Sequence, residues 1–127
     1  MKLRDFAILI CVALITASLD DGRAYAQQSV EVGTGAVLRW MDRTNSETDD
    51  IEIRNATSGQ IGPLRVELGE CRYPVGNPAG DAFAFLTIHA EGQARPFFSG
   101  WMVASSPALN ALEHPRYDLW VLRCTSG

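Results

Sequence analysis

Apolar and polar residues alternate with a period of two along much of this chain, which is the spacing of a β-strand with one buried face. The clearest run is residues 64–68, where leucine and valine alternate with charged residues. In residues 82–88, Phe83 and Phe85 fall on one face, and alanine, leucine and isoleucine fall on the other. Shorter runs predict strands at residues 37–41 and 51–53. Two further runs are apolar on both faces, which predicts central strands at residues 97–103 and 117–122.

Turn-forming segments separate these runs at residues 44–50, 55–63, 74–80 and 91–96. About six short strands with turns at this spacing predict an all-β domain, a small antiparallel β-sandwich or barrel. One short helix is expected at residues 107–113, because Ser106 suits an N-cap, Pro107 suits the first helical position and Pro115 must end the helix. This helix would bridge the last two strands and cover one end of the core.

The N-terminus follows a different pattern. Two basic residues precede an apolar run at residues 6–19, and Ala24 and Ala26 have the spacing that a signal peptidase reads. Residues 1–26 are therefore predicted to be a secretory signal peptide; the alternative is an uncleaved anchor, although a spanning helix needs roughly 20 apolar residues. Cleavage would leave residues 27–35 as a flexible N-terminus and residues 36–127 as a single β domain. The expected location is the periplasm or the exterior, with no membrane insertion after leader cleavage.

The charge of the chain excludes two classes of partner. The chain has 11 basic and 15 acidic residues and a net charge of −4. After the predicted leader, all the basic residues are arginines, scattered among a larger number of acids. An acidic domain of this kind has no electrostatic footprint for nucleic acid or for anionic lipid. Neither is expected as a partner.

Two of the three cysteines, Cys71 and Cys124, lie after the predicted leader. In an oxidising compartment they most simply form a disulfide. A redox-active pair or a pair of metal ligands is the alternative, but the two residues lack a CxxC spacing. Cys71 is out of phase with the apolar residues at 64–68, so a regular strand would point its sulfur outward. A β-bulge at Gly69 would correct the phase.

Candidate catalytic residues gather in the last quarter of the chain. A serine hydrolase would need a base close to Ser105 or Ser106, and His114 is near in sequence. Capping explains Ser106, however, and no Gly-x-Ser-x-Gly elbow is present. Glu113 and Asp118 are the best carboxylate pair for glycoside hydrolysis, although any acidic domain offers such pairs. Glu113, His114 and Asp118 are therefore only weak catalytic candidates.

Metal and cofactor sites have little support, because the chain has only two histidines, His89 and His114, with no pairing motif between them. No metal and no cofactor are predicted. Aromatic residues could instead form a stacking face for sugar rings or a protein partner. The candidates are Trp40, Tyr73, Trp101, Tyr117 and Trp120, although their apolar surroundings favour packing in the core. Trp101 stands out because the preceding glycine permits close backbone approach.

Residues 98–124, FSGWMVASSPALNALEHPRYDLWVLRC, resemble a family of small exported proteins of unknown function from alphaproteobacteria. Residues 36–42, AVLRWMD, and the single cysteine at Cys71 are similar to other landmarks of that family. Residues 47–62 depart from its pattern. The resemblance implies a periplasmic or envelope location and brings no established reaction.

These observations favour a non-catalytic binding or assembly module of the cell envelope, with an envelope protein or a glycan as its partner. The expected binding residues are Trp101, Glu113, His114, Arg116 and Tyr117. The alternative is a small carbohydrate-active protein that uses Trp101 with the two carboxylates at 113 and 118. A shallow exposed aromatic patch is typical of a binding module, whereas convergent carboxylates in a cleft are typical of an enzyme.

Overall fold

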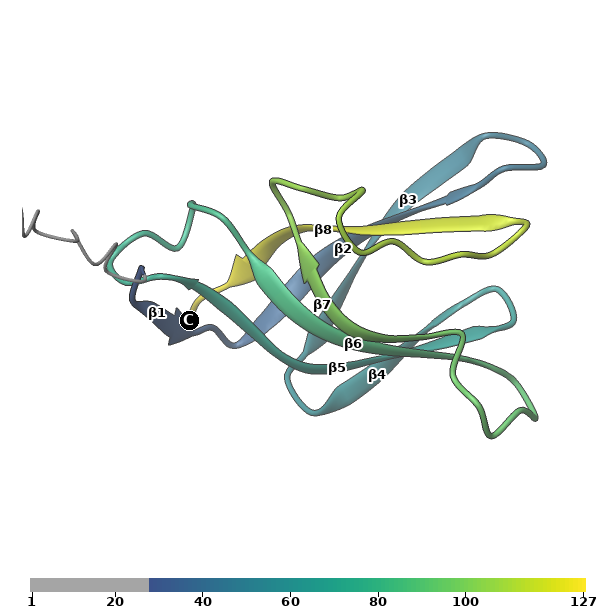
Figure 1. The fold of residues 1–127 in the computed structure, drawn as a ribbon, viewed down its shortest axis with the longest axis horizontal. Coiled ribbons are helices and arrows are strands. Elements are labelled where there is room, and N and C mark those ends of the chain that lie inside the picture. Colours follow the sequence, from purple (N-terminus) through teal and green to yellow (C-terminus); the bar gives the residue numbers. More distant parts are fainter. Residues whose placement is uncertain (1–27) are drawn as a thin grey trace, which may run out of the picture.

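The computed structural model describes residues 28–127, which form eight β-strands in two sheets packed face to face (Figure 1). The strands are β1 (Val30–Val32), β2 (Gly35–Asp42), β3 (Glu47–Arg54), β4 (Thr57–Ile61), β5 (Leu64–Pro74), β6 (Phe83–Ala90), β7 (Phe98–Val103) and β8 (Tyr117–Thr125). The predicted all-β sandwich is confirmed, and both sheets are open rather than closed into a barrel. The predicted leader lies outside the described residues. Within the part that is described, there is no helix with the length and apolar character needed to cross a membrane.

All strand pairs are antiparallel. The first sheet has the order β1-β5-β6-β7, and β4 also pairs with β5. Since β6 occupies one edge of β5, the strands β4 and β1 share the other edge, β4 along residues 64–68 and β1 along residues 72–74. The second sheet has the order β3-β2-β8. The strands β3 and β4 follow one another in the chain but belong to different sheets, so the chain crosses between the layers at Asn55 and Ala56.

The core lies between the sheets and consists mainly of aliphatic side chains at alternate strand positions. Six of them in the first sheet are at most 2% exposed: Leu64, Val66, Leu68, Ala84, Leu86 and Ile88. The second sheet contributes Ala36, Leu38, Ile53, Leu119 and Val121. Burial of each valine, leucine or isoleucine side chain stabilises the fold by roughly 1.5–3 kcal/mol. The alternation at residues 64–68 therefore identifies the inner face of β5 correctly, and the alternation at residues 82–88 separates the two faces of β6.

Both cysteines reach the core because a β-bulge precedes each of them. Between the pairs Leu68–Leu86 and Cys71–Ala84, β5 contains one more residue than β6. An equivalent irregularity in β8 precedes Cys124. The resulting Cys71–Cys124 disulfide, with Cα atoms 5.6 Å apart, joins the two sheets. The predicted disulfide and the predicted bulge at Gly69 are confirmed.

The helix expected at residues 107–113 is not formed. One turn closes where the Leu109 N–H donates to the Ser106 carbonyl at 3.0 Å, and an irregular segment then leads to β8. The Asn110 side-chain amide donates to the Trp101 carbonyl at 3.0 Å, and Leu112 is 3% exposed. These contacts bury the Leu112 side chain and give a hydrogen-bond partner to a backbone carbonyl at the edge of β7. An isolated helix of two turns is marginal in water, so the tertiary contacts override the local helix signals.

The strands β7 and β8 lie at sheet edges, so the expectation that both are central is wrong. The edge of β7 is covered in part by the following loop, because the carbonyls of Trp101 and Val103 accept from Asn110 and Ser106. A Cβ atom at Gly100 would lie 2.9 Å from the Asn110 amide nitrogen, so a larger residue would displace the side chain that binds the Trp101 carbonyl. The outward apolar residues of β7 have no neighbouring layer over them.

Residues 27–35, predicted to be a flexible N-terminus, contain the strand β1. Its three residues pair with Arg72 to Pro74 of β5, and Val30 and Val32 are 41% and 54% exposed. The chain then turns at Gly33, whose N–H donates to the Cys71 carbonyl at 2.7 Å. The first sheet is therefore extended by one short strand directly after the first described residues.

Candidate binding surface

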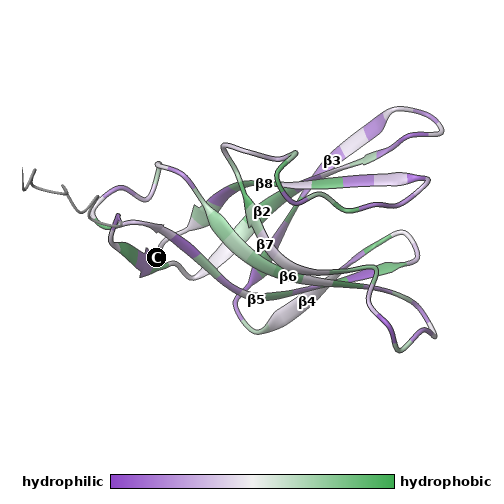
Figure 2. Ribbon diagram, viewed as in Figure 1, coloured by the Kyte–Doolittle hydropathy of each residue, from purple (hydrophilic) through white to green (hydrophobic). Residues whose placement is uncertain are grey.

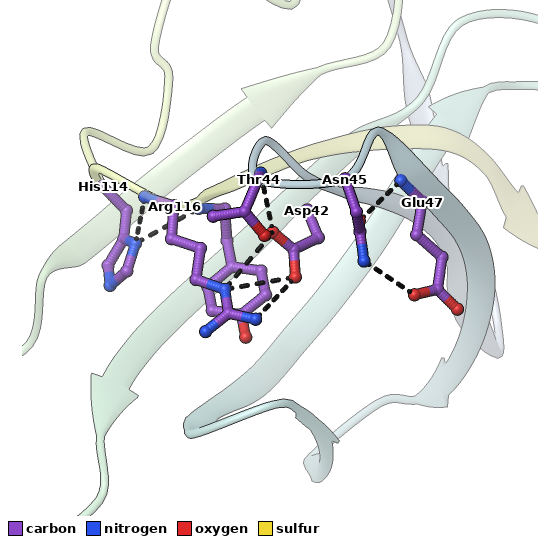
Figure 3. Close-up of polar contacts among 7 residues, drawn as sticks. Asp42, Thr44, Asn45, Glu47, His114 and Arg116 are labelled. Carbon is purple, nitrogen blue, oxygen red and sulfur yellow. Dashed lines mark hydrogen bonds and ion pairs between the residues drawn. The ribbon is translucent and has the colours of Figure 1, made fainter.

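His114 lies in the loop before β8 and accepts hydrogen bonds from the backbone (Figure 3). Its Nδ1 accepts the N–H of Arg116 at 3.1 Å and that of Tyr117 at 3.2 Å. The imidazole ring also packs against Phe97 and Tyr117, with ring centroids 5.1 Å and 5.4 Å away. Because the Nδ1 lone pair accepts hydrogen bonds from two backbone N–H groups, this atom orders the loop and is not free to act as a general base.

Arg116 joins the start of β8 to the end of β2 through Asp42 (Figure 3). Its Nη2 and Nε lie 2.9 Å and 3.1 Å from Oδ2 of Asp42, which is 5% exposed. The Thr44 hydroxyl and N–H donate to Oδ1 at 2.6 Å and 2.9 Å. The Arg116 guanidinium and then the Thr44 donors hold the pKa of Asp42 well below its usual range. The charge of Arg116 is therefore used to hold two strands together.

The carboxylate of Asp118 is likewise paired with an arginine. The Arg43 Nε donates to its Oδ2 at 3.0 Å, and the Arg43 Nη2 contacts its Oδ1. The Arg43 Nη1 also donates to the His114 carbonyl at 3.2 Å. Glu113 is exposed on the neighbouring loop. One exposed carboxylate beside one that is paired with arginine does not match the acid and base that face each other in a glycosidase.

The serines and the histidine that could serve a hydrolase or a metal site have other contacts in the structure. The Ser105 hydroxyl donates to Asp81 at 2.6 Å, and the Ser106 carbonyl accepts within its own turn. His89 lies on β6, with Nε2 3.7 Å from a Glu67 carboxylate oxygen. Across residues 28–127, no three His, Cys, Asp or Glu side chains come together in a group that could hold a metal ion.

Trp101 lies on the outer face of the first sheet and is 36% exposed. It pairs across the strands with Phe85, and the two rings are 5.3 Å apart at an angle of 70°. Arg72 reaches over the indole, with Cζ 4.8 Å from the ring centroid, and its Nε donates to Glu70 at 3.0 Å. These four side chains form a fixed cluster across β5, β6 and β7, in which aromatic and cation–π contacts hold the tryptophan in place.

Apolar neighbours extend this cluster into a patch, which we call the Trp101 face. Its members are the outward residues Val30, Val32, Glu70, Arg72, Phe83, Phe85, Trp101 and Val103, all of them exposed or partly exposed. A shallow hollow of about 270 Å³ lies within it, lined by Gln28, Val30, Arg72, Phe83 and Trp101. Figure 2 shows the hydrophobic positions of β1 and β6 that belong to this sheet. The patch is shallow and aromatic, as is typical of a binding surface.

The outer face of the second sheet has a different character. At its centre the Arg39 Nε lies 2.7 Å from the Asp50 carboxylate, and the half-buried Trp120 stands opposite Arg39 on the next strand. Of the three tryptophans, Trp40 packs against the core, whereas Trp101 and Trp120 lie on outer faces. Among the described residues, exposed aromatic and aliphatic side chains therefore gather on the outer face of the first sheet, beside the part of β5 that follows the Arg65–Glu67 ion pair.

The predicted binding residues separate into two groups. Trp101 belongs to the outer face of the first sheet, while His114, Arg116 and the buried Tyr117 belong to the junction of β2 and β8. The reasoning from sequence missed the other residues of the Trp101 face, chiefly Val30, Val32, Arg72, Phe83 and Phe85. A signal for two of them was present, because the alternation in residues 82–88 sets both phenylalanines opposite the aliphatic face that fills the core.

Comparison with known proteins finds a relative and a family that are both described as uncharacterised. No solved structure matches this chain. The uncharacterised protein RP359 of Rickettsia prowazekii (strain Madrid E) is 23% identical over 87 residues, which cover 66% of this chain and 56% of that relative. The chain thus spans little more than half the length of this relative. A model of a family described as uncharacterised protein conserved in bacteria matches residues 36–124, so the chain belongs to that family, DUF2155.

Proposed function

We propose that this protein is exported to the cell envelope and acts there as a non-catalytic binding or assembly module, with the Trp101 face as its recognition surface. The observation that carries the proposal is the aromatic and aliphatic patch on the outside of a sheet whose inner face is already packed. Large contiguous apolar patches on soluble proteins mark interaction sites. Tryptophan and arginine are also the residues most enriched at the energetic centres of protein interfaces.

Export is supported by two independent features. The N-terminal residues have the order of a charged region, an apolar run and small residues that a secretory leader shows. The buried disulfide between the sheets belongs to proteins that fold in an oxidising compartment. Together they favour the periplasm or the exterior as the location.

A protein partner fits this surface better than a glycan does. A sugar ring stacks on an open aromatic face, but the Arg72 guanidinium already lies over the Trp101 indole and Phe85 meets it at a steep angle. The carboxylates that a glycosidase would use are not free as a pair, because Arg43 binds Asp118. The surface is therefore suited to apolar contact around a central arginine.

Site-specific photocrosslinking in cells tests this proposal. A benzoylphenylalanine at Val103, on the Trp101 face, is expected to give discrete crosslinked products in the envelope fraction, and Trp101→Ala in the same chain should remove them. The matched control carries the photoreactive residue at Trp120, on the outer face of the second sheet. Equal product patterns from the two positions, or products that survive Trp101→Ala, would contradict the proposal.

A further inference from the structure

We infer that the partner of the Trp101 face is a second copy of this chain, so that two copies pack their first sheets against each other about a two-fold axis. This inference rests on the proposed function, since it names the occupant of the same surface. It follows from three properties of the described residues: the charges within the face, the position of the remaining charges, and the state of the sheet edges.

The Trp101 face carries one acid and one base, and they stand two residues apart on β5. Glu70 and Arg72 both point outward, since the intervening Cys71 is buried, and they form an ion pair within the copy. A two-fold axis through this part of the sheet brings Glu70 of each copy to Arg72 of the other. Such a face is complementary to itself, as an isologous interface must be. The apolar residues around the pair would be buried against their own counterparts.

A cluster of acidic residues lies on the other layer, where Arg39 neutralises one of them. Four acidic residues belong to β3, at the edge of the second sheet: Glu47, Asp49, Asp50 and Glu52 (Figure 1). Packed sheets are about 10 Å apart, and three such intervals separate the β3 strands of two copies joined through their first sheets, so these strands are roughly 30 Å apart. This distance exceeds the Debye length of about 8 Å at physiological salt. The carboxylates of β3 therefore oppose this arrangement only weakly.

Pairing through the edge of β3 or of β7 is less favourable for this chain. Two β3 edges would bring the same four carboxylates together, which is how many proteins protect an exposed edge. At β7, the loop already uses the carbonyls of Trp101 and Val103. Association through the sheet face avoids both obstacles. The face is small, because β1 to β7 spans only roughly 15 Å across the strands, so the dimer is expected to be weak and to form in the micromolar range.

Sedimentation velocity on the protein purified from the periplasm, from about 1 to 500 µM, tests the inference. The sedimentation coefficient is expected to rise with concentration. Arg72→Glu places two acids opposite two acids, and Glu70→Arg places two bases opposite two bases, so each should weaken self-association at least about tenfold. An equimolar mixture of these two variants should recover it, because every contact between 70 and 72 across the axis then joins opposite charges.

The chain contains a matched control on the same strand. Arg65 and Glu67 form another ion pair two residues apart, outside the Trp101 face, with Nη2 and Oε1 2.8 Å apart. Arg65→Glu and Glu67→Arg should leave self-association unchanged. Thermal melts of all four variants report whether each is folded, and Trp101→Ala gives a second route to the same loss of association without a change of charge.

Three results would overturn the inference: a wild-type protein that stays monomeric over the whole range, charge variants that associate as well as the wild type, or a mixture that fails to recover. The photocrosslinking experiment separates this failure from that of the proposed function. If the Val103 probe gives Trp101-dependent products with a different protein while the chain is monomeric, the recognition surface stands and the second copy is wrong. If the chain is monomeric and the probe gives no such products, both are wrong.

Discussion

Removing the Cys71–Cys124 disulfide should cost this domain much of its stability. The two cysteines are 0% and 4% exposed and connect β5 of one sheet to β8 of the other, with a sequence separation of 53. The crosslink stabilises the fold chiefly because it reduces the conformational entropy of the unfolded chain. Replacement of both cysteines by alanine removes this constraint while it introduces no polar group into the core.

The magnitude follows from the length of the closed loop. For a loop of this length the chain-entropy relation gives about 4 kcal/mol at 25 °C. The loss of two buried sulfur atoms adds about 1 kcal/mol or less, since alanine leaves only a small cavity at each position. The total is a large part of the roughly 5–15 kcal/mol that holds a typical domain together. For a domain of about 100 residues, each kcal/mol lowers the Tm by roughly 4–8 °C, so a fall of at least about 15 °C is expected.

Urea unfolding of the oxidised wild type and of the double alanine variant measures this loss. The m-value should rise in the variant, because an unfolded chain without the crosslink exposes more surface. Cys71→Ala alone should cost about as much as the double change, since one missing partner already abolishes the bridge. A loss below about 1 kcal/mol in the double variant would refute the argument, as would wild-type protein whose two thiols react with iodoacetamide before reduction.

Three further predictions concern single residues. His114→Ala should lower the free energy of unfolding by about 1–3 kcal/mol, because two backbone N–H groups lose their acceptor; Glu113→Ala beside it should change the Tm little, and equal effects would contradict this role. Ala56 has a φ of 59°, so Ala56→Gly should raise stability by about 0.5–1 kcal/mol in urea titrations and Ala56→Val should lower it; a glycine variant no more stable than the wild type would contradict the strain. The depressed pKa of Asp42 means that its ion pair stabilises the fold at neutral pH and that this stability is lost as the pH falls below the unfolded value of about 4. The Tm should therefore fall less steeply from pH 7 to pH 2 for Asp42→Asn than for the wild type, whereas the exposed Asp49→Asn should keep the wild-type slope. Parallel curves of Tm against pH for all three proteins would contradict the assignment.

Six of the eight strands in residues 28–127 could be predicted from local patterns of apolar residues, whereas β1 lies in the segment expected to be flexible and β4 in the expected turn segment at residues 55–63. Residues 64–68 and 82–88 are the clearest examples, and both lie in the middle of the first sheet. The disulfide and the bulge at Gly69 could be predicted together, since the phase error of Cys71 has one simple correction. These features require only the period of a strand and the geometry of one sulfur.

The wrong predictions of a helix at residues 107–113 and of central positions for β7 and β8 have a common cause. The segment after β7 has good helix signals, but Asn110 and Leu112 find better partners on the edge of β7 and in the core. Residues 97–103 are apolar on both faces, a pattern that predicts cover on both sides. Neither the partner of a loop nor the position of a strand within its sheet is encoded by local periodicity.

The same reasoning explains why the Trp101 face escaped prediction. A strand with apolar residues on both faces is either buried on both faces, or buried on one face and exposed as a binding surface on the other. A single sequence does not distinguish these two cases. In this protein the outward side of β6 and β7 meets solvent, so Phe85 and Trp101 make their aromatic contacts with each other and with the Arg72 guanidinium rather than with a second layer. Aromatic side chains exposed on a fixed surface, with an arginine held between them and an acid, are the features on which the proposed recognition surface rests, because such residues are enriched where proteins bind their partners.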